Sequence, residues 1–466
     1  MNNSNKKLNQ VVFFNLLGPI IMKGISFFTI PVFVRLLGAE NYGIYTVYAT
    51  YQTLFATIMG MQMNAGIGAI DLYHEGKERE RCASNAMSIS LVSSLIFVLF
   101  VFLFIGPISA AMELTPLIIG IMLIQCVGVN AVDFALASFT YHKKAKTNFF
   151  FSIVIALSGV LLSLLFILFW MRDSEPYVGY IWGHAIPYAV FGLAFIVFFL
   201  WKGKSLFCKK HWRFMLSLCL PVVFHALSNI VLHQSDKIML QKMTNDAAVG
   251  VYGFAVSFVN VLNIIYNALN TTWVPFYHDD IRENHMERLK RKTNNYVFLA
   301  TCMAIGFIMA MPEVVKLFVQ KDFWGSIDVI PILVVGIYLA FLYTFPVNFE
   351  FYYKKTKNIA LGTICAALIN IGLNFVFVRL FGMIGAAVAT MISYGALYLF
   401  HLIMARYVIK EEYHYPYKFF YFYLAVLLVF TGVYYLIADL LWLRWVLFAI
   451  AAAAALGRII RNKSIF

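Results

Sequence analysis

The chain has 466 residues, of which 62% are hydrophobic and 12% are charged, and its mean hydropathy is +0.79. Soluble domains usually carry about 25% charged residues, so this composition excludes an ordinary soluble protein and indicates a polytopic membrane protein. A net charge of +14 would suggest nucleic-acid binding in a soluble chain. Here the Lys and Arg residues fall mostly in short segments between apolar runs, which is the pattern of a topology signal.

The first apolar run begins after Lys6 and Lys7 and extends to Leu37 without a small-residue cleavage site, so we expect a retained first span. The chain is long enough for twelve to fourteen spans of about 20 residues. The pattern predicts an all-α protein with fourteen transmembrane helices, and Phe381 and Gly382 give a stop signal after the eleventh. The predicted helices are 11–37, 43–70, 83–108, 115–138, 149–171, 177–201, 212–241, 247–276, 293–319, 328–350, 358–380, 383–409, 417–438 and 441–458.

The distribution of positive charge predicts the orientation of these helices. If the N-terminus lies in the cytoplasm, most of the 36 Lys and Arg residues fall in cytoplasmic segments. Lys23 and Lys237 are assigned to spans, and Arg444 is assigned to an outer segment. Short cytoplasmic loops are enriched in Lys and Arg, so we predict that both termini are cytoplasmic.

Short motifs recur about 210 residues apart, which indicates an internal repeat. The segment Tyr141–Lys146 resembles Tyr352–Lys357, and Gly43–Tyr45 resembles Gly250–Tyr252. An even number of spans per repeat gives both halves the same orientation. The predicted domains are an N-terminal six-helix lobe at 1–201, a basic cytoplasmic linker at 202–213, a C-terminal six-helix lobe at 214–410, and helices 13 and 14 with a cytoplasmic tail at 411–466.

The first two helices of the second half, within Leu220–Thr271, are unusually polar for a membrane. Their candidate residues include His225, Asn229, His233 and Asp236, which fall within an arc of about 80° on an α-helix. Polar groups in hydrocarbon are costly unless they face protein or water. We therefore predict one wall of a polar cavity.

The second helix of each half carries a row of small polar residues. Small polar residues commonly pack helices together in membranes, so packing is one interpretation, and a hydrated groove along the whole helix is the other. The rows are Thr46, Thr50, Thr53, Thr57, Gly60 and Asn64 in the first half, and Gly253, Ser257, Asn260, Asn263, Asn267 and Thr271 in the second.

The first helix of the chain carries Lys23 near mid-span, on the edge of a face that includes Asn15 and Ser26. A mid-span lysine costs about 2.5–3.5 kcal/mol on insertion scales, so Lys23 needs a partner or a wet cavity. We predict that Asp236 is that partner. The pair is either purely structural, or Lys23 receives an anionic substrate group such as phosphate.

Three further ionisable residues have two interpretations each. Lys237 lies nearer a helix end and either extends to the interface or lines the cavity. His225 and His233 are two turns apart on one face, and each is either a hydrogen-bonded structural residue or a proton-coupling group.

Enzyme chemistry has no support in the sequence. The six cysteines are scattered without metal-ligand spacing and mostly lie in apolar runs, so we expect no metal site and no cofactor. A P-loop, an HExxH motif and a nucleotide-binding fold are all absent from the sequence. The sequence therefore predicts a transporter, and coupling to H⁺ or Na⁺ is a hypothesis.

A set of motifs resembles the polysaccharide and oligosaccharidyl-lipid transporters, a branch of the multidrug/oligosaccharidyl-lipid/polysaccharide exporter superfamily that includes O-antigen flippases. The set covers about residues 1–409, and each motif alone is weak. The motifs are Leu36–Tyr45, Asp236–Leu240, Ala248–Tyr252, Tyr352–Lys357, Asn370–Asn374 and Gly382–Thr390.

This resemblance implies a two-lobed bundle that alternates between inward-facing and outward-facing states, with helices 1, 2, 7 and 8 around the cavity. It implies a substrate with a polyprenyl tail, a pyrophosphate and an oligosaccharide. The chain departs from that pattern in its few intramembrane cations and in its fourteen helices, because O-antigen flippases are commonly drawn with twelve. Extra helices also occur in lipid II flippases of the same superfamily.

The sequence thus predicts a flippase for a lipid-linked repeat unit of O-antigen, capsule or a similar glycan in the bacterial cytoplasmic membrane. Its partners would be the polyprenyl-pyrophosphate oligosaccharide, membrane lipids and glycan-assembly proteins such as a polymerase, but no nucleic acid. The alternatives are a cation-coupled multidrug-type exporter, a lipid II-type flippase, and a membrane scaffold or polymerase of glycan assembly. Candidate ion-coupling residues are Asp236, His225 and His233, and candidate substrate-binding residues are Lys23, Asn15, Ser26, Thr53, Thr57, Asn64, Asn229, Asn260, Asn263, Asn267 and Lys237.

Overall fold

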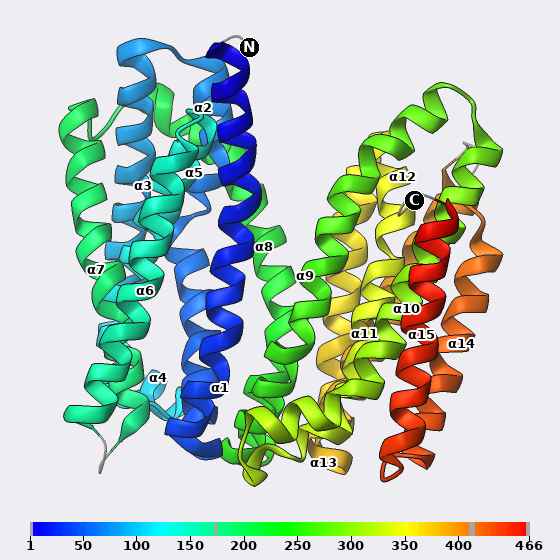
Figure 1. Cartoon of the computed structure of the whole chain (residues 1–466). Helices are drawn as coiled ribbons and strands as arrows, with labels where there is room; N and C mark the ends of the chain where they lie inside the picture. Colours follow the sequence, from blue (N-terminus) through cyan, green and yellow to red (C-terminus); the bar gives the residue numbers. More distant parts are fainter. Residues whose placement is uncertain (1–2, 172–174, 410–414, 463–466) are drawn as a thin grey trace. The chain divides into compact units, whose positions relative to one another are not determined.

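The computed structural model describes residues 3–171, 175–409 and 415–462, with side chains for all of these except residues 3–23, Ser26 and Thr356. Every regular element in these ranges is helical, which confirms the all-α prediction (Figure 1). Eleven helices are long and apolar enough to cross a membrane, or twelve if the bent pair Phe27–Gly60 and Met63–Tyr73 counts as one span. The chain is therefore a multi-pass membrane protein.

The helices divide into two compact units. Unit 1 comprises Met1–Leu37 and Ile44–Ile230, and unit 2 comprises Gly38–Gly43 and Val231–Phe466. The long helix α8 (Lys209–Met243) contributes to both units. The predicted lobe and linker boundaries stay a prediction.

Unit 1 is built around α7, which packs against α3, α5 and α6. Small residues let these helices approach closely: a Cβ placed on Gly128 would lie 2.3 Å from the backbone oxygen of Tyr188. The elements of the unit are α1 (Asn3–Gly60), η1 (Met63–Gly66), α2 (Ile67–Tyr73), α3 (Gly76–Leu103), α4 (Ile105–Met112), α5 (Pro116–Tyr141), α6 (Ala145–Phe169) and α7 (Pro176–Gly203).

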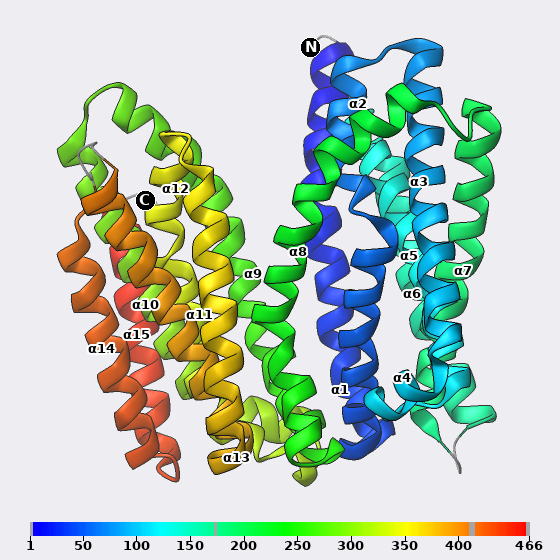
Figure 2. The ribbon, with the colours of Figure 1, turned by 180° about the vertical axis from the view of Figure 1, so that it is seen from behind.

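Unit 2 has two neighbouring sets of helices. α11 packs against α9 and α13, and α10 packs against α14 and α15, which lie side by side in both views (Figure 2). The elements are α9 (Asp246–Arg282), α10 (Met286–Phe318), η2 (Lys321–Phe323), α11 (Ser326–Leu342), α12 (Thr344–Tyr352), α13 (Thr356–Ile403), η3 (Met404–Val408), α14 (Tyr417–Leu436) and α15 (Leu441–Asn462).

Two of these elements each contain two helices joined at a glycine. Gly38 in α1 has φ 71° and ψ 175°, and Gly382 in α13 has φ 56° and ψ −129°. Positive φ values favour glycine because it has no Cβ. Both breaks fall where the sequence predicts them, between the first and second helices and between the eleventh and twelfth.

The second predicted helix, at 43–70, is wrong in its last third. The helix ends at Gly60, and Met61 and Gln62 adopt φ values of 50° and 51° before the short 3₁₀ helix η1 begins. These two left-handed residues interrupt the helix, and the segment Met63–Tyr73 continues with a bend of 49°. Asn64 therefore does not share a helical face with Thr57, as the sequence pattern suggested.

The internal repeat is visible in matching loop conformations. Lys143 and Lys354, which the sequence aligns, both have φ 58°. In both loops the next residue, Lys144 or Lys355, donates its backbone N–H to the carbonyl oxygen five residues earlier at 2.8 Å. Two equivalent sequences thus form the same turn in the two units.

An ion pair also recurs at equivalent places. Arg79 Nη1 lies 2.9 Å from Asp71 Oδ1 in unit 1, and Arg288 Nε lies 2.6 Å from Asp280 Oδ1 in unit 2. Asp280 is fully buried and also contacts Lys292 at 3.0 Å. Each pair joins the end of one helix to the start of the next, so it fixes the turn between them.

The placement of Arg444 corrects the sequence interpretation. Arg444 is not in an outer loop but lies buried in the first turns of α15, and its guanidinium makes two hydrogen bonds to Glu313 on α10, at 2.5 and 2.8 Å. A buried arginine is retained where a bidentate carboxylate neutralises it. This pair fastens α15 to unit 2.

Candidate functional site

A ladder of amides runs along one face of α9. Asn263 Nδ2 donates to Asn260 Oδ1 at 3.2 Å, and Asn267 Nδ2 donates to Asn263 Oδ1 at 3.1 Å. Thr271 continues the row by donating its hydroxyl to the Asn267 carbonyl at 2.9 Å. Asn260, Asn267 and Thr271 are exposed in unit 2, and Asn263 is half-buried. The ladder holds the amides in fixed directions and leaves further donors and acceptors available.

Asp236 on α8 is buried in unit 2 and belongs to a group of hydrogen-bonded polar residues. Its side chain is 3% exposed, and its carboxylate accepts hydrogen bonds from the Tyr252 hydroxyl and from the Lys237 backbone N–H. The Lys237 ammonium donates to Gln234 Oε1 at 2.6 Å. The i,i+3 spacing on α8 places Gln234 beside Lys237, so the cation and the carboxylate lie on adjacent residues with separate hydrogen-bond partners.

A second group of buried polar contacts joins α8 to α13. Ser235 Oγ donates to Asn370 Oδ1 at 2.9 Å, and Asn374 Nδ2 donates to the same oxygen at 2.9 Å. Asn370 and Asn374 are both fully buried, and Asn370 Nδ2 and Asn374 Oδ1 have no partner in the described part of the chain. Buried amides usually satisfy their donors and acceptors. A small polar ligand would find two ready partners here.

The two histidines of α8 have different surroundings. His233 Nδ1 is hydrogen-bonded to the Tyr394 hydroxyl of α13 within unit 2. His225, in unit 1, is hydrogen-bonded through Nε2 to Asn229 Nδ2 at 3.0 Å, one helical turn away. Both histidines thus have partners, and their role in ion coupling stays a prediction.

The threonine row of α1 is mostly turned inward. Thr46, Thr50 and Thr57 are buried, and Thr53 is half-buried. The Thr50 and Thr53 hydroxyls donate to the carbonyls of Thr46 and Ala49, four residues earlier, at 2.9 and 2.8 Å. These hydroxyls are occupied by their own helix, which is the arrangement expected of packing residues.

The face of α1 near its start lies outside the described side chains. This applies to Asn15, Lys23 and Ser26, whose backbone is helical. The predicted pairing of Lys23 with Asp236 therefore stays a prediction. Asp236 takes its described hydrogen bonds from unit 2 alone.

The sequence interpretation missed a buried ionic pair in unit 2. His401 Nδ1 on α13 lies 2.9 Å from Glu350 Oε1 on α12, and both side chains are 0% exposed. Glu350 Oε2 and His401 Nε2 have no partner among the described residues. Gly362 makes room for the ring, because a Cβ there would lie 2.6 Å from His401 Nε2. The sequence signal for this pair was Glu350 at the end of the predicted helix 328–350. A charged residue at a helix end is common, so this signal did not indicate a buried pair.

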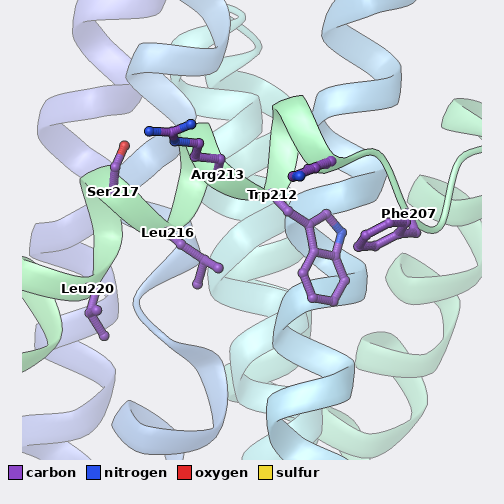
Figure 3. A pocket seen from close by; sticks show the side chains of 7 residues that line it. Phe207, Trp212, Arg213, Leu216, Ser217 and Leu220 are labelled. Carbon is purple, nitrogen blue, oxygen red and sulfur yellow. The ribbon is translucent and has the colours of Figure 1, made fainter.

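A groove of about 480 Å³ lies on the first turns of α8, remote in sequence from the amide ladder (Figure 3). Phe207 and Trp212 flank it with rings 5.1 Å apart, and Arg213, Leu216 and Leu220 line it further along. Aromatic rings beside basic residues are typical of the membrane–water interface. We interpret this groove as part of that boundary.

Comparison with known proteins places the chain in a family. A model described as "Polysaccharide biosynthesis protein" matches residues 8–279, more than half of the chain. The chain belongs to this family. The match confirms the resemblance found in the sequence motifs. The chain is also similar to the "Lsg locus putative protein 1" of Haemophilus influenzae. The two are 20% identical over 76% of this chain and 88% of that protein.

Solved structures with the same fold are transporters. A structure titled "Lipid II flippase MurJ, inward closed conformation" is similar with a TM-score of 0.74 and 17% identity, covering 97% of this chain and 99% of the other. An inward-facing transporter of the multidrug resistance MATE family, from the MOP superfamily, is similar with a TM-score of 0.64 and 14% identity, covering 82% and 94%. The chain therefore shares the fold of these two structures.

Proposed function

We propose that the protein is a flippase that moves a polyprenyl-pyrophosphate-linked oligosaccharide across the bacterial cytoplasmic membrane by alternating access. The observation that carries this proposal is the exposed amide ladder of α9. Sugar hydroxyls need both donors and acceptors, and a row of asparagines offers both without charge. The family membership supports a glycan, and the fold supports transport.

The proposal assigns separate roles to the candidate residues. The ladder residues Asn260, Asn263 and Asn267 would bond the sugars, and Lys23 would receive the pyrophosphate. Asp236, with its buried amide neighbours, would bind H⁺ or Na⁺ and couple it to the movement. The remaining candidates would complete the cavity surface. They are Asn15, Ser26, Thr53, Thr57, Asn64, Asn229 and Lys237.

Fourteen crossings with cytoplasmic termini are part of the proposal. Counting α13 as two crossings at Gly382, and α1 as two crossings at Gly38, brings the apolar helices to that number. Cysteine-accessibility labelling from either side of the membrane would test it. Labelling of introduced cysteines beside Lys144 and Lys355 from the outside would contradict the orientation.

The test of function is a surface-glycan assay in a bacterial host that lacks its own flippase and makes the matching repeat unit. Asn260, Asn263 and Asn267 are all replaced by Leu. Each lost hydrogen bond weakens binding by about 0.5–1.5 kcal/mol, or about 2–10-fold, so the triple variant should reduce surface glycan at least tenfold. Thr272→Val is the control, because Thr272 lies about 100° from Thr271 around the helix.

Two results would contradict the assignment. Full glycan export by the triple variant at normal protein level would show that the ladder asparagines do not bind the substrate. For the pyrophosphate role, Lys23→Ala should abolish export and Lys23→Arg should retain part of it. Normal export by Lys23→Ala would exclude that role.

The second candidate is a cation-coupled exporter of small molecules, favoured by the buried carboxylate of Asp236 and by the MATE-like fold. A lipid II-type flippase is a third, since a lipid II flippase shares the fold over nearly its whole length. Deletion distinguishes them: loss of a surface glycan supports the first proposal, drug sensitivity supports the second, and arrest of cell-wall synthesis supports the third.

A further inference from the structure

Two histidines and a cysteine meet in unit 1. His74 lies between α2 and α3, Cys82 lies in the second turn of α3, and His211 lies in the first turn of α8. One ligand atom from each residue lies within 4.8 Å of the other two. Cys82 is fully buried and His211 is 3% exposed. We propose that this cluster binds one zinc ion.

The hydrogen bonds of His211 leave one ring nitrogen free for a metal. His211 Nε2 donates to Glu78 Oε2 at 3.1 Å, because the carboxylate can only accept. In this tautomer Nδ1 keeps its lone pair, and it is buried without a partner among the described residues. A carboxylate behind a histidine is the usual support of a metal-ligating imidazole.

The other two residues supply matching ligand atoms. His74 Nδ1 is also buried without a described partner, and the rings of His74 and His211 meet edge to face at 5.5 Å. Two unsatisfied nitrogens beside one thiol are costly without a ligand. Thiolate and imidazole together are the ligands that zinc prefers over Mg²⁺ or Ca²⁺.

The distances fit a zinc centre after a small contraction. Zn–S and Zn–N bonds place the ligand atoms of a tetrahedral site about 3.3–3.8 Å apart. The present separations, up to 4.8 Å, would shorten when the metal binds.

A metal here would fasten the start of α8 to α3. The segment before α8 is already bound to α3, since Ser84 Oγ donates to the Ser205 carbonyl at 2.8 Å and Ser88 donates to that of Leu206. Zinc would add bonds at His211, one residue from the groove lined by Trp212 and Arg213 (Figure 3). The start of α8 would then be fixed to α3.

The test measures metal directly and does not depend on transport. The full chain is purified in detergent through a tag without histidine, and its zinc content is measured by mass spectrometry. We expect about one zinc per chain, since structural zinc sites bind tightly at neutral pH. Replacement of zinc by Co²⁺ should give visible bands and a thiolate charge-transfer band in the near ultraviolet.

Variants separate this site from adventitious metal. Cys82→Ser and His211→Ala should lose the zinc and the thiolate band, and Cys302→Ser, a buried cysteine in unit 2, should keep both. If the first two variants fail to fold by size-exclusion chromatography, Glu78→Gln is used, which should weaken zinc binding about 10–100-fold. Absence of zinc and of Co²⁺ bands in the unaltered protein, or an unchanged zinc affinity in Glu78→Gln, would overturn the proposal.

Discussion

The buried pair of Glu350 and His401 allows a quantitative test of the fold of unit 2. Both side chains are 0% exposed, and their contact is 2.9 Å. Removing one partner of a buried hydrogen-bonded pair costs about 1–3 kcal/mol, because the other group is left buried and unsatisfied. Glu350→Ala also leaves a cavity between α12 and α13, so we expect its unfolding free energy to fall by the upper part of that range.

A charge-free replacement should behave differently. Glu350→Gln keeps the shape and one acceptor for His401 Nδ1, so its cost should be nearer about 1–2 kcal/mol. Replacing both partners by apolar residues, as in Glu350→Leu with His401→Phe, removes the desolvation penalty of both polar groups. Such replacements are often neutral or stabilising, so the double variant should be more stable than Glu350→Ala.

The assay measures unfolding of all variants in the same detergent. Denaturant titration is used where refolding is reversible, and heating at one fixed scan rate is used otherwise. The prediction is an order: unaltered protein, then Glu350→Gln, then Glu350→Ala, with the double variant above Glu350→Ala. Equal stability of Glu350→Ala and the unaltered protein would refute the buried pair. A double variant less stable than Glu350→Ala would refute the desolvation reasoning.

Three further changes follow from the packing. Arg444→Met should lower the unfolding free energy by about 1.5–3 kcal/mol, since it removes two charge-assisted hydrogen bonds to Glu313; unchanged stability in the same unfolding assay would count against the pair. Asp280→Asn should cost a similar amount, about 1.5–3 kcal/mol, because it removes a buried charge with two cationic partners, and high salt should not reproduce the loss. Gly250→Ala should cost at least about 1–3 kcal/mol by overpacking, because its Cβ would lie 1.9 Å from a backbone oxygen; Gly372→Ala, with open space around it, is the control.

Local sequence determined most of the helical framework. Apolar runs bounded by charges predict most of the helices, because a membrane helix must satisfy its backbone internally and expose an apolar surface. The starts of α3 and α10 lie seven residues before the predicted positions. The breaks at Gly38 and Gly382 were also foreseen. The break at Met61 and Gln62 was not, because ordinary residues adopt left-handed conformations only when the surrounding structure stabilises them.

Contacts within one helix were equally accessible from the sequence. The amide ladder of α9 joins residues three and four apart, and helical geometry alone places such side chains together. The polar face of α8 follows from the same rule. This is why the candidate cavity residues could be named before the fold was known.

Pairings between distant helices were decided only by the tertiary structure. Glu350 and His401 are 51 residues apart, Glu78 and His211 are 133 apart, and no periodicity in the sequence connects the members of either pair. The cysteines appeared scattered because His74, Cys82 and His211 come from different elements, so their spacing carries no metal signature. Sequence alone determined which segments cross the membrane and which faces are polar. The pairing of charged groups and the convergence of ligand atoms depend on how the helices pack. The reason is that electrostatic and coordination energies depend on the distance between groups in space and not on their separation in the sequence.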